Sequence, residues 1–377
     1  MARIVYALSG QGRGHASRVL AIARELRQRG HELLFCGGGT ACDVLQASGE
    51  TVLPVPSLRQ VLHGNRMQLL ATLRANTTTL RKLRTLLDEL TEKLSAFRPH
   101  LLITDFEALT PRAAERLGVP VLSFNHQQIV TETRYPLPLR YWLDAALACL
   151  AIRLIAPKRP LHVLLTSFFF PPLRRPERTT LIPPIIRSEI QQLRPVSGEA
   201  ILVYVNQPEG VGHLPQVLAQ LAVPFILYNL PPPEDAARYP NLIFKKPSLD
   251  EFLHDLACAQ AVVCTAGFTL ISEALYLGKP LLVMPNRGIF EQTLNALFLE
   301  RDGMGMAVYD RLLRPEDVRR FLENLPYYRS RLWAYPKRPG NEAALACIEQ
   351  LLLRLERRAY RGKRVQTLHE NILRFSV

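Results

Sequence analysis

Apolar residues along the chain follow two recurring patterns, short continuous runs and longer stretches with helical spacing. The first run, Arg3–Leu8, predicts a buried strand, and Ala16–Arg29 follows it with the spacing of a helix that ends at Gly30. Glu32–Phe35 is a second strand-like run. A strand, a helix and a strand in this order make a β-α-β unit, which is the building block of a parallel sheet.

The same alternation continues in two sets, separated by the proline-rich stretch Pro171–Pro195, which has little periodicity and is the best linker candidate. In the first set we predict helical stretches and strands at Met67–Phe97, His100–Thr104, Pro111–Leu117, Pro120–Phe124 and Leu161–Leu165. In the second set we predict elements at Ala200–Asn206, His213–Leu221, Phe225–Tyr228, Leu242–Phe244, Leu249–Cys258, Ala261–Cys264, Thr269–Leu277 and Pro280–Met284. We therefore expect an α/β protein with two doubly wound, Rossmann-like domains, whose facing strand ends line a cleft.

We place the domain boundaries at 1–186, a linker at 187–198, the second domain at 199–345 and a C-terminal helix, crossing back to the first domain, at 346–377. The length of 377 residues suits two domains, and 48% apolar residues suffice for two cores. Six cysteines without CxxC spacing indicate a reducing compartment. The first residues lack the apolar core of a signal peptide, and Trp142–Ala156 is too short to cross a bilayer, so we expect a cytoplasmic protein.

The first predicted strand and helix are joined by a glycine-rich turn, Ser9-Gly10-Gln11-Gly12-Arg13-Gly14-His15. Glycines let the backbone approach a ligand closely, and a helix N-terminus attracts anions. A dinucleotide site needs a third glycine where His15 stands and an acidic residue at the tip of the second strand, which instead reads Cys36-Gly37-Gly38. The turn therefore disfavours a nicotinamide or flavin enzyme.

His15 is the unusual residue of this turn. A helix N-terminus favours the neutral imidazole, which is a competent general base when it faces a cleft. Asp105 ends another predicted strand of the same domain, so its carboxylate is expected at the same sheet edge, where it would fix the imidazole tautomer. The alternative is a structural histidine, with Asp105 capping a helix or pairing with an arginine.

The strongest signal is residues 264–292, which read as strand, small-residue turn, helix, glycine stop, strand and loop. The turn at Ala266-Gly267 would present backbone N–H groups to a diphosphate. Glu273 lies one turn into the helix, within reach of a ribose diol, and Glu291-Gln292 follow the next strand on the same edge, where they could read sugar hydroxyls.

This arrangement resembles the donor-binding motif of GT-B glycosyltransferases, in particular family 28, which includes the enzyme that forms lipid II, and the plant and animal UDP-sugar glycosyltransferases. The resemblance implies that Glu273 binds the ribose, that Glu291 and Gln292 bind the donor sugar, and that the diphosphate contacts Gly267, Phe268 and Thr269. In the N-terminal half, His15 and Asp105 match the base and its partner, and the glycine-rich loop is matched by Gly10, Gly12, Arg13 and Gly14.

The resemblance to these glycosyltransferases extends over most of residues 1–310. The segments Gly-Arg-Gly-His-Ala-Ser-Arg, Thr-Asp-Phe-Glu, Ser-Phe-Asn-His-Gln and Thr-Ser-Phe-Phe are also similar to a little-described prokaryotic group of family 28-like proteins. Thr265-Ala266-Gly267 stands where plant enzymes have His-Gly-Gly, and Glu291-Gln292 stands where the cell-wall enzyme has two glutamines.

The resemblance implies inverting transfer from a nucleoside diphosphate sugar, UDP-linked, to an acceptor hydroxyl. No Asp-x-Asp site stands out, so we expect no cofactor and no obligatory metal. One alternative is a sugar-nucleotide epimerase of the same fold, with Glu107 as an extra acid or base. Another is a non-enzymatic protein that binds an anionic polymer or a membrane. Glu107 and His126 are candidates on the acceptor side.

Acceptor pockets in this class come from N-terminal loops, here about Leu53–Thr79 and Gln127–Leu150, whose Leu, Arg and Tyr content suits an apolar or lipid-linked acceptor. The net charge of +14 favours an anionic partner, although a basic solvated surface would give the same charge. Near the C-terminus a helix is predicted to stop at Gly362, beside the basic residues Arg357, Arg358, Arg361, Lys363 and Arg364. We expect these to favour contact with an anionic membrane surface, and no nucleic acid partner.

Overall fold

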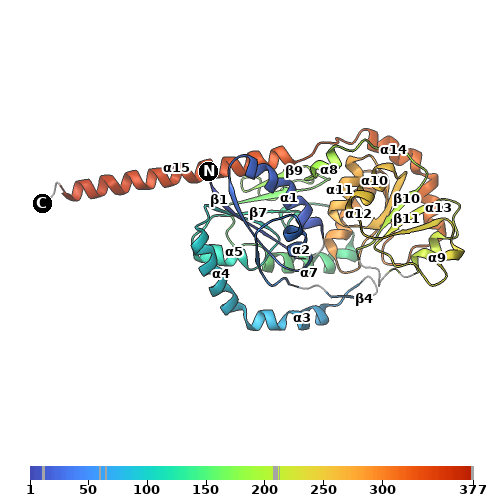
Figure 1. Ribbon diagram of the computed structural model, residues 1–377, viewed down its shortest axis with the longest axis horizontal. Helices are drawn as coiled ribbons and strands as arrows, with labels where there is room; N and C mark the ends of the chain where they lie inside the picture. Colours follow the sequence, from blue (N-terminus) through green and yellow to red (C-terminus); the bar gives the residue numbers. More distant parts are fainter. Residues whose placement is uncertain (11–12, 59–60, 64–65, 207–210, 212, 375–377) are drawn as a thin grey trace.

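The computed structural model describes residues 1–10, 13–58, 61–63, 66–206, 211 and 213–374, and for residues 13, 62–63, 66–67, 69 and 359–374 it describes the backbone alone. Two parallel sheets lie side by side along the long axis of the molecule, each flanked by helices (Figure 1). This arrangement confirms the α/β prediction with two Rossmann-like domains.

The N-terminal sheet has seven strands in the order β3-β2-β1-β6-β7-β8-β9. Their bounds are β1 Arg3–Leu8, β2 Glu32–Gly37, β3 Val52–Pro54, β6 Leu101–Asp105, β7 Val121–Asn125, β8 His162–Thr166 and β9 Thr179–Ile182. A two-stranded ribbon, β4 Leu62–His63 with β5 Arg66–Met67, stands apart. Strands β1, β6 and β7 are apolar and almost wholly buried, as strands covered on both faces must be.

The second sheet has six parallel strands in the order β12-β11-β10-β13-β14-β15. Their bounds are β10 Ile201–Tyr204, β11 Phe225–Tyr228, β12 Leu242–Lys245, β13 Ala261–Thr265, β14 Leu281–Met284 and β15 Gly305–Ala307. In both sheets the strand order reverses beside the first strand of the domain, so both switch points open toward the same cleft.

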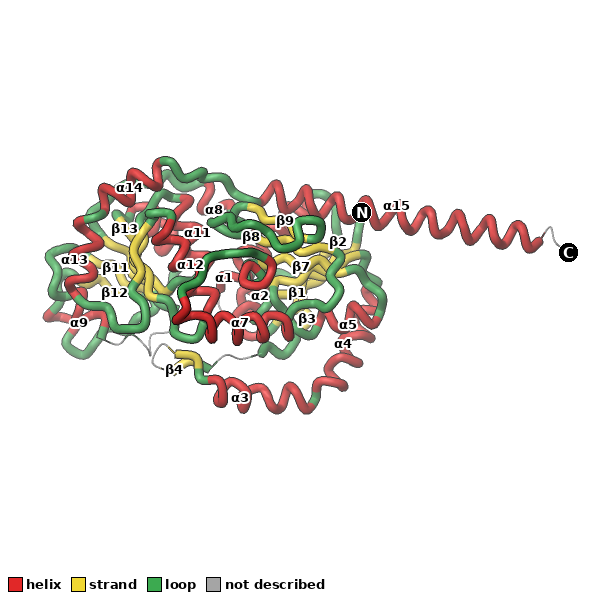
Figure 2. Tube along the Cα trace, turned by 180° about the vertical axis from the view of Figure 1, so that it is seen from behind, coloured by secondary structure: helices red, strands yellow, loops and turns green. Residues whose placement is uncertain are grey.

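Helices cover both faces of the sheets (Figure 2). In the first domain they are α1 Arg13–Gln28, α2 Gly39–Ala47, α3 Leu69–Arg81, α4 Leu83–Phe97, α5 Thr110–Arg116, α6 Ile129–Glu132, η1 Leu139–Tyr141 and α7 Trp142–Ile155. In the linker and the second domain they are α8 Ser188–Gln191, α9 Leu214–Leu218, η3 Ala236–Arg238, α10 Leu249–Cys258, α11 Phe268–Tyr276, α12 Phe290–Arg301, α13 Pro315–Glu323 and α14 Leu325–Trp333. The last helix is α15 Asn341–Arg374.

The proline-rich linker candidate contains more structure than its sequence predicts. Thr179–Ile182 forms β9, which pairs in parallel with β8 at the sheet edge. An edge strand tolerates flanking prolines because only one side of its backbone is paired. The sequence did not predict β9 because this stretch lacks the alternation of apolar residues that marks a strand.

The C-terminal helix α15 lies against the first domain, where it packs on α1. Its apolar side chains Ala344, Leu345, Ile348, Leu351 and Leu352 belong to the N-terminal core. It begins at Asn341, whose side chain bonds both backbone groups of Ile186, and so earlier than the boundary at 346. The prediction that it stops at Gly362 is wrong, because the helix continues to Arg374, a single helical glycine costing only about 1 kcal/mol.

The two domains share a buried apolar contact. Phe169, from the loop after β8, stacks on Phe298 of α12 with ring centroids 3.9 Å apart, and Phe168 stacks on Phe268 of α11. His126, after β7, lies parallel to Phe268 at 3.8 Å. The segments Ser-Phe-Asn-His-Gln and Thr-Ser-Phe-Phe therefore supply the surface on which the second domain rests.

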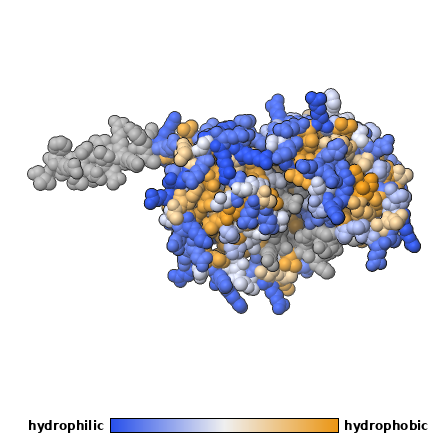
Figure 3. All heavy atoms as spheres, in the orientation of Figure 1, coloured by the Kyte–Doolittle hydropathy of each residue, from blue (hydrophilic) through white to orange (hydrophobic). Residues whose placement is uncertain are grey.

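Helices α3 and α7 carry many exposed apolar side chains. On α7 these include Trp142, Leu143, Leu147, Leu150 and Leu154, while Ala145 and Ile152 are buried. Apolar residues also appear among hydrophilic ones on the face of both domains seen in Figure 3. Within the described part of the chain, no helix combines the length and apolar character needed to cross a membrane.

Candidate functional site

A cleft of about 2930 Å³ lies between the carboxyl ends of the two sheets and is lined by both domains. The first domain contributes the loop after β1, the start of α1, the loops after β6 and β7, and one face of α7. The second contributes the N-termini of α11 and α12. Parallel strands that end at one edge bring these loops together, as the sequence predicted.

His15 and Asp105 meet at this edge. The register of β1 and β6 sets Leu8 beside Asp105, and the backbone N–H of Ser9 donates to the Asp105 carbonyl at 3.0 Å, so the loop leading to α1 starts next to the carboxylate. His15 is in the first turn of α1, and its Nδ1 lies 3.1 Å from Asp105 Oδ1. Phe106, which follows Asp105, has a φ of 59°, a strained left-handed conformation that turns the chain at the cleft.

A third residue, Arg18, shares this carboxylate. Its Nη2 lies 3.0 and 3.1 Å from the two oxygens of Asp105 and 3.2 Å from His15 Nδ1. Burial raises the pKa of Asp105, but the charges of Arg18 and His15 outweigh it and leave that pKa lowered. Asp105 therefore stays ionised and can stabilise an imidazolium. Both alternatives weighed for Asp105, a histidine partner and an arginine partner, are present together.

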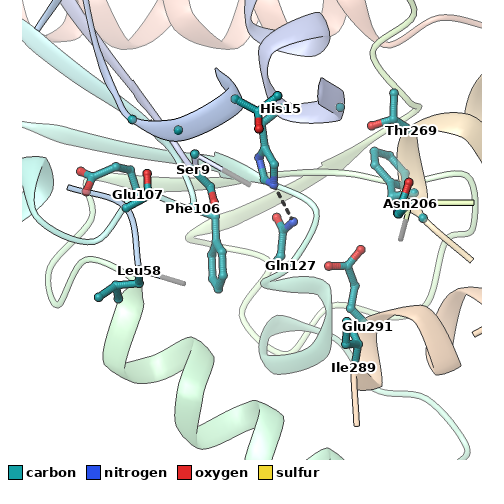
Figure 4. Close-up of a pocket in the computed structure, with 18 of the residues that line it drawn as sticks. Ser9, His15, Leu58, Phe106, Glu107, Gln127, Asn206, Thr269, Ile289 and Glu291 are labelled. Atoms are coloured by element: carbon teal, nitrogen blue, oxygen red, sulfur yellow. Dashed lines mark hydrogen bonds between the residues drawn. The ribbon is translucent and has the colours of Figure 1, made fainter. Parts of the chain in front are cut away.

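Arg18 and Gln127 were not singled out by the sequence. Gln127 Nε2 lies 3.4 Å from His15 Nε2, the nitrogen that faces the cleft, and the two side chains point toward one another (Figure 4). Arg18 follows His15 by three positions on a helix, which places both on one face. That spacing, in Gly-His-Ala-Ser-Arg, is the signal that could have identified Arg18.

The donor-side motif folds as predicted, with β13, the turn at Ala266-Gly267 and helix α11 in succession. Gly267 precedes α11 in an extended conformation, and Phe268 and Thr269 form its first turn, whose backbone N–H groups lack helical partners. Gly267, Phe268 and Thr269 all line the cleft. The positive end of the α11 dipole thus faces the cleft.

Glu273 lines the cleft but is 3% exposed, and its carboxylate is paired. Arg187, at the start of the linker, donates to its two oxygens at 2.8 and 2.7 Å. Bidentate pairing fixes the plane of the carboxylate and leaves lone pairs for another donor. Sequence reasoning missed Arg187, because the linker carries no periodic signal.

Glu291 and Gln292 lie at the start of α12 with different environments. Gln292 is buried, and its Oε1 accepts a hydrogen bond from the Asn286 backbone at 2.9 Å. Glu291 extends toward the space near Gln127 (Figure 4), and its carboxylate lies 3.9 Å from His126 Nε2. Within the described residues, Gln292 therefore has the closer polar contact, and the Glu291 carboxylate is the better placed of the two to bind a ligand in the cleft.

His126 and Glu107, the acceptor-side candidates, both have structural contacts. His126 is fully buried between the domains, with Nδ1 2.8 Å from the Thr166 carbonyl and Nε2 2.8 Å from Asn295 Oδ1. Burial lowers its pKa, against the opposing charge of Glu291. The carboxylate oxygens of Glu107 accept the backbone N–H groups of Leu109 and Thr110, which caps α5. Burial raises the pKa of Glu107 against these hydrogen bonds.

The glycines of the first turn allow close packing. A Cβ on Gly14 would lie 2.6 Å from Thr269 Oγ1, so this glycine lets α1 approach α11. A Cβ on Gly10 would overlap Ser57 and the Gly38 carbonyl. Gly12 lies outside the described residues, as does the side chain of Arg13. Among the described residues no group of three metal-binding side chains is found.

Comparisons with known proteins agree with this geometry. A family model described as glycosyl transferase family 1 matches residues 2–326. Uncharacterized glycosyltransferases of the archaea Methanosarcina acetivorans and Methanosarcina mazei are each 25% identical to the chain, over 80% of its length and 84% of theirs.

Similar solved structures include the glycosyltransferase of kitacinnamycin (TM-score 0.66, 19% identity, 93% of this chain and 98% of that one) and the calicheamicin glycosyltransferase CalG4 (TM-score 0.65, 19% identity, 94% and 99%). MurG of Acinetobacter baumannii is also similar (TM-score 0.61, 16% identity, 93% and 100%). At these identities the structures establish the fold alone, and the narrower resemblance to family 28 stays a prediction. The chain therefore belongs to glycosyl transferase family 1 and is a glycosyltransferase with the GT-B fold.

Proposed function

We propose that the protein transfers a sugar, with inversion at the anomeric carbon, from a UDP-linked donor to the hydroxyl group of an apolar or lipid-linked acceptor. One observation carries the proposal. The His15–Asp105 pair of the first domain faces the N-terminus of α11 across the cleft, and Arg18 bridges Asp105 to Thr269 of that helix. A base and an anion site are thus held within a few side-chain lengths of each other.

In the proposed reaction, His15 Nε2 takes the acceptor's hydroxyl proton as the acceptor oxygen forms its bond to the anomeric carbon. The bond from that carbon to the diphosphate oxygen breaks, and the diphosphate leaves with the electron pair. Asp105 stabilises the imidazolium, and the first-turn N–H groups of α11 stabilise the leaving anion. Charges of opposite sign therefore develop on opposite walls of the cleft.

The donor assignment draws on the second domain. Glu273 is proposed to accept hydrogen bonds from the ribose hydroxyls while Arg187 holds it in place, and Glu291 with Gln292 to face the sugar. A structure of the relative VinC is a complex with dTDP, which supports a nucleoside diphosphate ligand in this fold. Uracil as the base rests on the resemblance to UDP-sugar enzymes.

The acceptor assignment draws on α3 and α7. Leu73 of α3 and Leu147, Leu150 and Leu154 of α7 line the cleft, although each is about half exposed or more. Exposed leucines that continue from a catalytic cleft offer apolar surface to a ligand, since burying it is worth about 25 cal/mol per Å².

The proposal is tested by a thermal-shift screen against nucleoside diphosphates and their sugars, followed by incubation of the best donor with short-chain lipid acceptors. A ligand that binds the native state raises the melting temperature by mass action. We expect UDP and one UDP-sugar to stabilise the protein, and transfer to give a product of inverted anomeric configuration by NMR. Free sugar released without any acceptor would favour the epimerase alternative, and no shift with any nucleotide would favour a binding protein.

We also propose peripheral contact with an anionic membrane through the basic residues near the C-terminus, which would suit a lipid acceptor. Arg357 and Arg358 are exposed on α15, and the side chains of Arg361, Lys363 and Arg364 lie outside the described residues. Each basic residue near such a surface contributes about 1 kcal/mol. Co-sedimentation should require anionic liposomes and weaken with salt. An absence of binding at low salt would instead support a small-molecule acceptor.

A further inference from the structure

The Arg18 side chain joins the two walls of the cleft at the site of the proposed chemistry. Arg18 is 6% exposed and lines the cleft. Its Nη2 holds both oxygens of Asp105, while Nη1 donates to Thr269 Oγ1 of the other domain at 2.8 Å. The charge lies 5.3 Å from the Phe268 ring. A single planar group therefore contacts the partner of the base and the first turn of the donor helix.

The contact with Thr269 fixes where that hydroxyl can donate. A guanidinium has hydrogen-bond donors and no acceptor, so Thr269 Oγ1 must be the acceptor in this bond. The hydroxyl's own proton is left to point away from Arg18. Because Thr269 lines the cleft beside the unpaired N–H groups of α11, that proton can be donated to a phosphate oxygen.

The surroundings of Arg18 are short of negative charge. The N-termini of α1 and α11 approach so closely that Gly14 and Thr269 leave no room for a Cβ between them. Each helix end carries roughly half a positive charge. Among the residues that the structure describes, Asp105 supplies the carboxylate within hydrogen-bonding distance of Arg18. One carboxylate beside a guanidinium and two converging helix N-termini leaves a local excess of positive charge, which an anion can compensate.

We propose that Arg18 is a positioning residue that serves both halves of the reaction. It orients the Thr269 hydroxyl toward the donor's diphosphate and holds Asp105 in place for His15. The inference rests on the proposed function, since it requires a diphosphate at the N-terminus of α11. The position of the base His15 then depends on how closely the second domain approaches, because one guanidinium contacts both Asp105 and Thr269.

The test is calorimetric titration of the whole protein with UDP and, as a matched ligand without phosphates, with uridine. Arg18→Gln should weaken UDP binding by about 10-fold or more, as expected for loss of a hydrogen bond to a charged group, and leave uridine binding unchanged. Thr269→Val should have a similar effect. The double variant, Arg18→Gln with Thr269→Val, should have the same UDP affinity as the single variant that binds UDP more weakly. The two losses should not add, because both changes act through one hydroxyl.

Two further variants separate positioning from folding. Arg18→Gln leaves Asp105 buried without its cation, so Arg18→Gln with Asp105→Asn should recover melting temperature without recovering UDP affinity. Arg18→Lys keeps the charge but lacks the fork that reaches both partners, so it should not restore UDP affinity. Equal loss of UDP and uridine affinity, or full UDP affinity in Arg18→Gln, would overturn the inference. If the wild type binds no nucleoside diphosphate, the proposed function itself fails.

Discussion

The two walls of the cleft are organised differently. In the first domain, His15, Asp105 and Arg18 form a connected network whose members lie 3.0–3.2 Å from one another. In the second domain, the polar residues of the motif are held separately. Glu273 pairs with the linker, Gln292 bonds a neighbouring backbone N–H, and Glu291 extends into the cleft.

This difference indicates which changes should affect chemistry and which should affect binding. A connected network fails as a unit when one member is lost, because the remaining buried groups lose their partners. Separately held residues should have separable effects. We therefore expect loss of His15 or Asp105 on the first wall to reduce turnover, and each substitution on the second wall to reduce affinity for one part of the donor. Arg18 should affect both, because it also contacts Thr269 of the second wall.

The largest effect is expected for His15→Ala. Turnover should fall by about 100- to 10,000-fold, because the general base is lost, while UDP affinity stays within about 2-fold of the wild type. Steady-state kinetics and calorimetry on the same preparation measure both. Asp105→Asn should give a smaller loss of the same kind. Near-normal turnover of His15→Ala at saturating acceptor would show that the histidine is structural.

Glu273→Ala should weaken UDP binding by about 10- to 150-fold, because a charged acceptor of the ribose hydroxyls is lost. The matched control is Arg187→Gln, which breaks the same buried ion pair but keeps the carboxylate. Both variants should melt at a lower temperature, and Glu273→Ala should lose much more UDP affinity. Equal affinities in the two variants would assign the pair to folding alone.

Glu291→Gln should raise the KM of the UDP-sugar by about 10-fold, since one hydrogen bond to a charged group is weakened, and leave the affinity for UDP unchanged. Comparison of the two ligands isolates the sugar. A parallel loss of UDP affinity would place Glu291 at the nucleotide instead.

The acid side of the stability profile should show a smaller effect. Asp105 has a lowered pKa in the folded protein and a value of about 3.9 when unfolded. Its stabilising contribution is therefore complete above about pH 4 and is lost as the pH falls through the folded pKa. Chemical unfolding between about pH 2 and 5 should show a shallower pH dependence for Asp105→Asn. Identical slopes would mean that Asp105 is not held as an ion pair.

The smallest effect is expected from metal removal. EDTA should change turnover by less than about 2-fold, because backbone N–H groups and Arg18 are proposed to stabilise the diphosphate without a divalent ion. Loss of activity that Mg²⁺ or Mn²⁺ restores would show that a metal takes part.

Sequence reasoning succeeded where the signal is local. Continuous apolar runs predicted the central strands, and parallel strand order predicted that His15 and Asp105 share an edge. It missed contacts between distant segments. Arg187 reaches Glu273 from a linker without periodicity, and Arg18 reaches Thr269 across 251 positions. No spacing rule reports such pairs, since they depend on how two finished domains dock.

The same limit explains why the sequence did not predict the structural contacts of His126 and Glu107. His126 and Glu107 are polar residues next to strand ends, the position at which ligand-binding residues are expected. Only packing shows that His126 is enclosed by Phe268 and Phe169, and that Glu107 caps α5. A polar residue at a strand end can bind a ligand, or it can bond to the backbone and side chains around its own loop.

The central claim is that the donor's diphosphate docks on the first turn of α11, opposite His15. Hydrogen–deuterium exchange with and without saturating UDP tests it directly. We predict slower exchange in peptides that contain Gly267, Phe268 and Thr269, with little change in α3 and α7. Unchanged exchange at 267–269, with protection elsewhere in a protein that demonstrably binds UDP, would contradict the account.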